Sequence, residues 1–114
     1  MKKITSFLTL LLLTGLLVSE SIAQDGMVTL ESTYSAEETT NRLESALTEN
    51  GLTIFRKVDH QEGASSVDME LPPTIVFIFG NPKLGTPLMQ CAPTMAIDLP
   101  QKMLTWENEN GHVK

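Results

Sequence analysis

The feature that most constrains this fold is the run TIVFIF at residues 74–79, which is apolar at every position except its first. A short run rich in β-branched and aromatic residues, without polar alternation, is typical of a strand covered on both faces. We therefore expect a central strand here. The stretch that follows, GNPKLGTP at residues 80–87, ends the strand with two glycines and two prolines.

The sequence before this run predicts one strand and one helix. Residues 27–34 (MVTLESTY) alternate apolar and polar side chains, which predicts a half-buried strand. Ser35 and Glu38 then form a capping box, in which the Ser35 hydroxyl can accept the Glu38 amide. The helix that begins there has one apolar face and ends at Asn50 and Gly51, residues that tolerate left-handed backbone.

The remaining segments predict further strands around the central strand. Residues 52–60 alternate as a second strand, and residues 61–66 (QEGASS) are interpreted as a loop. Residues 94–100 (TMAIDLP) alternate again and lead to a strand at 102–108. The Asn-Gly pair at 110–111 is typical of a hairpin turn, yet only three residues follow. We therefore expect that a returning strand is missing and that the chain self-associates or folds poorly.

The beginning of the chain has the three parts of a secretory signal peptide. Met1-Lys2-Lys3 is basic, residues 7–18 (FLTLLLLTGLLV) are almost wholly apolar, and small residues stand at Ser21 and Ala23. The apolar run is shorter than the ~20 residues that span a bilayer. The sequence thus predicts cleavage after Ala23, a single domain over residues 24–114, export to the periplasm or medium, and no stable membrane anchor.

The charge balance excludes some partners. The chain has 14 acidic and 8 basic residues and a formal net charge of −6. Nucleic acids and anionic membrane surfaces attract basic patches, so we expect neither as a partner. Cys91 is the single cysteine and has no partner for an internal disulfide. Stability must come from the core or from a second copy.

Several short motifs, in order, resemble the family known as domain of unknown function 302. They are TxxRLxxAL at 39–47, VDH at 58–60, ELPPT at 70–74, FGNPKLGTPLM at 79–89, IDLP at 97–100 and the Trp106 that follows. The resemblance implies an α/β domain of the α+β type: two layers, an antiparallel sheet with helices packed on it, and a dimer. It also implies a further C-terminal strand and helix, and no established activity or cofactor.

The segment after the central strand has two interpretations. As a turn, Gly80 supplies positive φ, Asn81 holds the backbone, and Thr86 caps a helix whose first turn contains Pro87. As a site, the bare backbone at Gly80, Asn81, Gly85 and Thr86 together with a helix N-terminus could bind a small anionic ligand.

Two other groups of residues are candidates for chemistry. Asp59 and His60 form an acid–imidazole pair, although neighbouring strand residues point to opposite faces. The alternative interpretation is a strand-terminal histidine capped by loop backbone. Cys91, with Met89 and Met95 near it, could bind monovalent copper, but these residues are also ordinary core fillers.

These observations predict an exported, non-catalytic binding or interaction domain that works as a homodimer without a cofactor. One alternative is a small periplasmic enzyme that uses His60 near residues 81–86, and another is a copper binder. If His60 and the Gly85–Thr86 backbone share a pocket, the enzyme gains support; if they lie at opposite ends of the sheet, it loses support.

Overall fold

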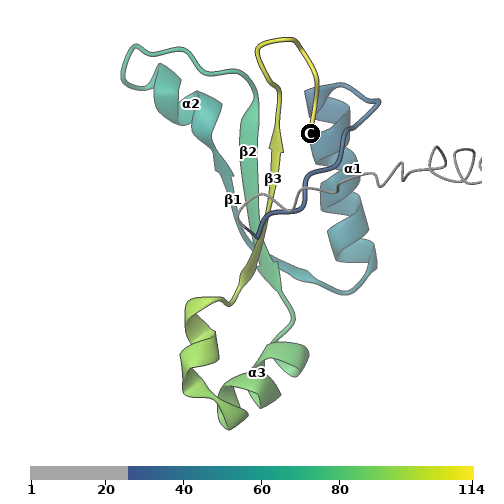
Figure 1. Cartoon of the computed structure of the whole chain (residues 1–114), viewed down its shortest axis with the longest axis vertical. Helices are drawn as coiled ribbons and strands as arrows, with labels where there is room; N and C mark the ends of the chain where they lie inside the picture. The colour runs from purple at the N-terminus through teal and green to yellow at the C-terminus, as the bar shows by residue number, and fades with distance from the viewer. Residues whose placement is uncertain (1–25) are drawn as a thin grey trace, which may run out of the picture.

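The computed structural model describes residues 26–114, so the predicted signal peptide lies outside the described residues. The elements follow in the order α1 (Ala36–Glu49), β1 (Thr53–Asp59), α2 (His60–Ser65), β2 (Thr74–Gly80), α3 (Pro82–Cys91), the 3-10 helix η1 (Pro93–Ile97) and β3 (Gln101–Trp106). The strands form an antiparallel sheet in the order β1-β2-β3 (Figure 1). The expected α+β class and the central position of the TIVFIF strand are both confirmed.

The first helix begins and ends where its sequence signals lie. The Ser35 hydroxyl accepts the Glu38 amide at 3.2 Å, and the Arg42 guanidinium pairs with the Glu38 carboxylate at 2.7 Å. Asn50 is the C-cap, and Gly51 follows with φ +72°. Because each signal is local, the sequence predicts this helix without knowledge of the rest of the fold.

One face of the sheet packs on α1 and forms the core. Leu47 of α1 and Phe77 and Phe79 of β2 are 4%, 0% and 3% exposed. Thr40 of α1 also shares a buried 2.9 Å hydrogen bond with Thr105 of β3. Phe77 and Phe79 point to the same side because side chains alternate along a strand.

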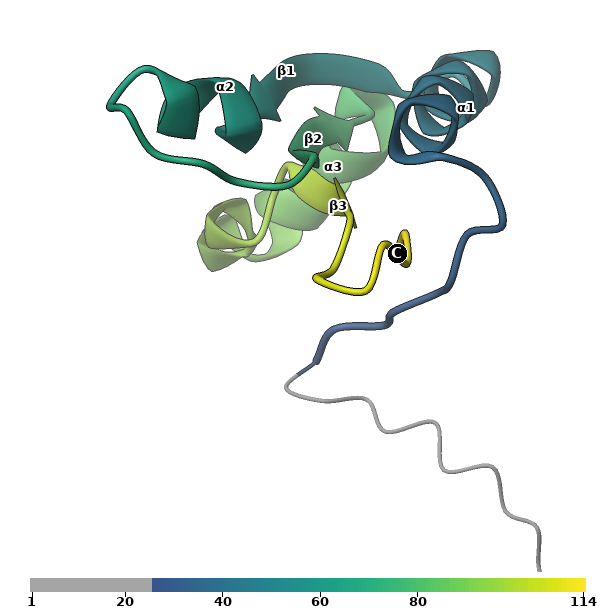
Figure 2. The same ribbon diagram turned by 90° about the horizontal axis from the view of Figure 1, so that it is seen from above.

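The other face of β2 is only half covered. Thr74, Val76, Ile78 and Gly80 all retain intermediate exposure. Figures 1 and 2 show α1 on one side of the sheet and α2 on the other, near one end. No described helix lies over the middle of this second face. The run that the sequence predicts to be buried on both sides is therefore deeply buried on one side only.

A β-bulge interrupts β1 near its start. Ile54 pairs with Phe79 and Arg56 pairs with Ile78, which leaves Phe55 as an extra residue. A bulge turns the strand and redirects its side chains. Here Phe55 remains half exposed and lies beside Gly80.

Two predictions in the first half of the domain are wrong. Residues 27–34 form no strand: Ser32 makes an isolated bridge with Val113, while Val28 and Leu30 are 81% and 77% exposed. Alternation produces a strand only where a neighbouring strand pairs along it. The predicted loop at 61–66 is mostly the helix α2, which begins because the Asp59 carboxylate accepts the Glu62 amide at 3.0 Å.

Two further predictions fail after β2. The helix does not begin at Thr86; α3 begins at Pro82 with Asn81 as its N-cap, and Pro87 lies inside it. Pro87 inside the helix removes one backbone hydrogen bond. The Asn81 cap and Pro82 in the first turn nevertheless allow the helix to begin before it. The alternating segment at 94–100 contains the 3-10 helix η1 rather than a strand, and Ile97 is 87% exposed.

The predicted hairpin turn near the end of the chain is confirmed, but the expected lack of a returning segment is not. Gly111 has φ +76°, and its amide donates to the Asn108 carbonyl at 2.9 Å. Val113, 5% exposed, forms bridges with both Glu107 and Ser32. The backbones of Trp106 and Lys114 also exchange two hydrogen bonds. The last residues thus pair with the end of β3.

Candidate functional site

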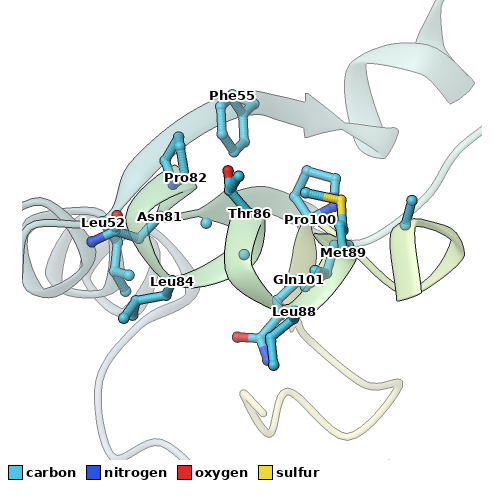
Figure 3. Close-up of a pocket in the computed structure, with 14 residues that line it drawn as sticks. Leu52, Phe55, Asn81, Pro82, Leu84, Thr86, Leu88, Met89, Pro100 and Gln101 are labelled. Atoms are coloured by element: carbon cyan, nitrogen blue, oxygen red, sulfur yellow. The ribbon is translucent and has the colours of Figure 1, made fainter. Parts of the chain in front are cut away.

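A cavity of about 360 Å³ lies where β2 ends and α3 begins (Figure 3). Its walls come from the start of β1, the end of β2, one side of α3, η1 and the residues that lead into β3. The FGNPKLGTPLM segment contributes most of the lining: Gly80, Asn81, Pro82, Leu84, Gly85, Thr86, Leu88 and Met89. The motif that carries the family resemblance therefore builds this cavity.

Gly80 lies close to neighbouring side chains and has ordinary backbone angles. It is the last residue of β2 and is not among the glycines with positive φ, so the predicted left-handed turn is wrong. A Cβ at Gly80 would lie 3.3 Å from Cε2 of Phe55 and 3.7 Å from Cβ of Pro100. The absence of a side chain allows the Phe55 ring to approach the strand end.

The backbone donors that an anion would need are already used. Pro82 has no amide hydrogen, and the Lys83 amide donates to the Asn81 side chain at 2.9 Å. The amides of Leu84 and Gly85 both donate to the Asn81 carbonyl at 2.9 Å. The first turn of α3 therefore has no free N–H group and offers the expected anion site no backbone donors.

The cavity is mainly apolar. None of its lining residues carries an acidic, basic, imidazole or thiol side chain. Thr86 points toward Phe55, and Met89 lies beside Pro100 (Figure 3). Within residues 26–114, neither the Thr86 hydroxyl nor the Gln101 carboxamide has a side-chain hydrogen bond to the protein. These two groups can bind a ligand without losing an existing contact.

Asp59 and His60 lie at the other end of the sheet. Asp59 pairs with Ile75 at the start of β2, whereas Gly80 is the last residue of that strand. The separation is roughly 17 Å along the strand. Asp59 caps α2, and His60 is the exposed first residue of that helix. The structure thus brings together Gly80, Asn81, Gly85 and Thr86 but not the acid–imidazole pair.

Sequence reasoning missed the walls that come from distant segments. Leu52 and Phe55 lie more than twenty residues before the motif, and Ala96, Leu99 and Pro100 follow it. The alternation of β1 conceals the bulge, because an extra residue is visible only once the strands are paired. The paired glycines at 80 and 85 were the one available signal that something approaches this backbone.

The copper candidate gains no coordinating cluster. Cys91 is exposed, and residues 26–114 contain no group of three or more histidine, cysteine, aspartate or glutamate side chains placed to hold a metal ion. Met89 instead lines the cavity.

The comparisons with known families and with solved structures agree. Residues 28–114 match the family described as "Domain of unknown function DUF302". The fold is similar to the crystal structure of an uncharacterized conserved DUF302 protein from Bacillus stearothermophilus, with a TM-score of 0.66 and 16% identity. The superposition covers 74% of this chain and 66% of that chain.

Curated relatives occur in Brucella. The chain is 44% identical over 93 residues to "Fluoride-specific ion channel FluC 1" of Brucella suis biovar 1 (strain 1330) and of Brucella abortus biovar 1 (strain 9-941). The match covers 82% of this chain but only 37% and 34% of those proteins. The chain therefore spans about a third of the length of these relatives. Of the helices within residues 26–114, none has the length and apolar character to cross a membrane.

Proposed function

Since this chain belongs to the DUF302 family, we propose that it is a non-catalytic interaction domain that pairs with a second copy of itself. The observation that supports this most directly is the half-covered face of the sheet opposite α1. We call it the open sheet face and define it by Arg56, Val58, Val76, Ile78, Lys102, Leu104 and Trp106.

An apolar row crosses the centre of the open sheet face. Val58 of β1 pairs with Val76 of β2, which pairs in turn with Leu104 of β3. The two valines are half buried and Leu104 is 38% exposed. Contiguous apolar side chains on a sheet face whose middle no described helix covers are typical of an interface.

Charge favours a second copy as the occupant. Arg56 and Lys102 stand on either side of Ile78, and neither forms a salt bridge within residues 26–114. By contrast, Lys57, which shares a face with Phe77, pairs with Glu44 at 2.7 Å. The exposed Glu70 lies beside α2, beyond the other end of the face. Two basic residues thus stand at one end of the face, and an acidic side chain, Glu70, lies past the other end.

A two-fold axis near Val76 would exploit this polarity. Two sheets packed face to face with antiparallel strands would place the basic end of each copy opposite Glu70 of the other. The apolar rows would meet at the centre, where charged residues are usually depleted in an interface. The same geometry satisfies both copies at once, as an isologous dimer requires.

The test is the oligomeric state of Lys102→Glu, measured by size-exclusion chromatography with light scattering. We expect a wild-type dimer and a shift of Lys102→Glu toward monomer, greatest at low ionic strength. Lys83→Glu is the matched control, because it makes the same charge change on α3, away from the open sheet face. Combining Lys102→Glu with Glu70→Lys should restore the dimer. A wild-type monomer, or equal effects of the two lysine substitutions, would refute the proposal.

The enzyme alternative has less support. His60 and the cavity lie at opposite ends of β2, so the geometry that would favour a His60 enzyme is absent. A cavity lining without titratable groups also supports binding over acid–base chemistry.

A second candidate function comes from the Brucella relatives, which are named fluoride-specific ion channels. The identity covers about a third of each of those proteins, so it supports fluoride transport less directly than the open sheet face supports pairing. Vesicles loaded with sodium fluoride and monitored with a fluoride electrode would test it. Efflux that requires this chain would favour the channel candidate, and efflux equal to that of empty vesicles would remove it.

Export is part of the proposal. Its support is the basic start, the apolar run at 7–18 and the small residues before Gln24. We expect mass spectrometry of the exported fraction to find Gln24 at the N-terminus. Intact Met1 in that fraction would contradict cleavage after Ala23.

A further inference from the structure

We infer that the cavity between α3 and the end of β2 binds a small, uncharged, largely apolar molecule that carries one hydrogen-bonding group. This inference does not depend on the proposed dimer, because the cavity and the open sheet face are separate features. The cavity volume of about 360 Å³ falls within the ~300–1,000 Å³ range of small-molecule sites.

The lining selects against a charged ligand. No side chain around the cavity carries a charge. The backbone amides in the first turn of α3 already donate hydrogen bonds to Asn81. A carboxylate or ammonium group moved from water into this cavity would lose its hydration and would gain no opposite charge, with only the Thr86 hydroxyl and the Gln101 carboxamide left to bond to it. A neutral molecule loses far less.

The apolar walls determine the body of the ligand. Leu84, Leu88 and Met89 come from α3, Phe55 comes from β1, and Leu99 comes from the segment between η1 and β3. Leu84 and Leu88 are 67% and 49% exposed, so a bound apolar molecule would cover surface that the fold leaves in water.

Two polar groups determine its head. The Thr86 hydroxyl can donate and accept, and the Gln101 carboxamide can do both. Neither has a side-chain partner within the described residues. An alcohol or amide group on the ligand could therefore bond to either of them, which gives orientation to an otherwise apolar site.

The ligand experiment uses two probes that differ in their head groups. Amide chemical shifts of the ¹⁵N-labelled protein are recorded during titration with 1-octanol and, separately, with octanoate. We expect 1-octanol to cause saturable shifts at Gly80, Gly85 and Thr86, and octanoate to bind at least tenfold more weakly. Equal affinity for the two probes, or no saturable shift with 1-octanol, would overturn the inference.

Two glycine substitutions locate the site. A Cβ at Gly85 would lie 3.6 Å from Leu99 and 3.9 Å from Met89, so the side chain of Gly85→Leu would grow into the cavity. A Cβ at Gly63 in α2 meets nothing within 4 Å, which makes Gly63→Leu the matched control. We expect only Gly85→Leu to abolish the 1-octanol shifts. Retention of these shifts in a folded Gly85→Leu protein would place binding elsewhere and overturn the inference.

A third substitution tests the head group independently of packing. Thr86→Val keeps the shape but removes the hydroxyl, and we expect 1-octanol to bind roughly two- to tenfold more weakly. Unchanged affinity would overturn the assigned role of Thr86.

The exposed Ile97 of a second copy is the competing occupant. If Ile97→Ser changes the amide shifts at Gly80, Gly85 and Thr86 in the same way as dilution of the wild-type protein does, and 1-octanol causes no further change, the cavity is a protein interface. The inference then fails.

Discussion

Gly80 and Gly85 lie in the same segment but differ in the space around them. At Gly80 an added Cβ would press on the Phe55 ring at 3.3 Å, while at Gly85 it would make only ordinary contacts. Phe55 is half exposed and can move by a few tenths of an ångström. We therefore expect Gly80→Ala to change the free energy of unfolding by less than about 0.5 kcal/mol, as measured by urea denaturation.

Gly85→Ala should increase stability. Gly85 lies inside α3 without positive φ, and alanine both favours the helix and restricts the unfolded chain. We expect the free energy of unfolding to rise by about 0.5–1 kcal/mol in urea denaturation. Gly51, at φ +72°, is the contrasting position, and Gly51→Ala should cost about 1 kcal/mol. Shifts of the same sign would contradict the assignment of backbone roles.

At the scale of elements, α1 and α2 differ in what holds them to the fold. Both have a side-chain cap, Ser35 for α1 and Asp59 for α2. However, α1 contributes Leu47 to the core, whereas α2 has no buried residue. Loss of the Ser35 cap should therefore lower the global free energy of unfolding, whereas loss of the Asp59 cap should change only the local structure of α2.

The prediction compares Ser35→Ala with Asp59→Ala. Ser35→Ala should lower the global free energy of unfolding by about 1 kcal/mol, because α1 must form for the core to close. Asp59→Ala should raise amide hydrogen exchange in α2 while leaving the urea midpoint nearly unchanged. A large global loss from Asp59→Ala would show that α2 is integral to the fold.

The sequence predicts elements well where their signals are local and poorly where pairing decides. The Ser35–Glu38 box and the Asn50-Gly51 end predict α1 from a few neighbouring residues. The alternation at 27–34 predicts a strand that does not form, since only Ser32 forms a bridge with Val113. Four of the six candidate site residues line the cavity because they are close in sequence. Its opposite wall, with Phe55, arises from a bulge that no local pattern reveals.

At the scale of the whole molecule, stability depends on a small core. Phe77 is the one large side chain within residues 26–114 that is fully buried. Phe77→Ala should cost about 3–5 kcal/mol, which approaches the entire stability of a small domain. We expect the Phe77→Ala variant to be largely unfolded at 37 °C, as measured by circular dichroism and NMR. Val76→Ala, on the half-covered face, is the control and should remain folded; similar behaviour of both variants would contradict a one-sided core.

The bridge between Ser32 and Val113 has a mechanical consequence. It joins the first and last parts of the described chain through a hydrogen bond of 2.9 Å from the Ser32 amide to the Val113 carbonyl. The exposed Glu31 carboxylate adds contacts with Lys114 Nζ at 3.2 Å and with His112 Nδ1 at 3.4 Å. The two segments run antiparallel, so tension applied to residues 26 and 114 would unzip this contact rather than shear it. The terminal residues would then peel from Trp106 before the pairing of β1 with β2 bears any load. A tether attached at both points would yield at low force and leave the sheet intact.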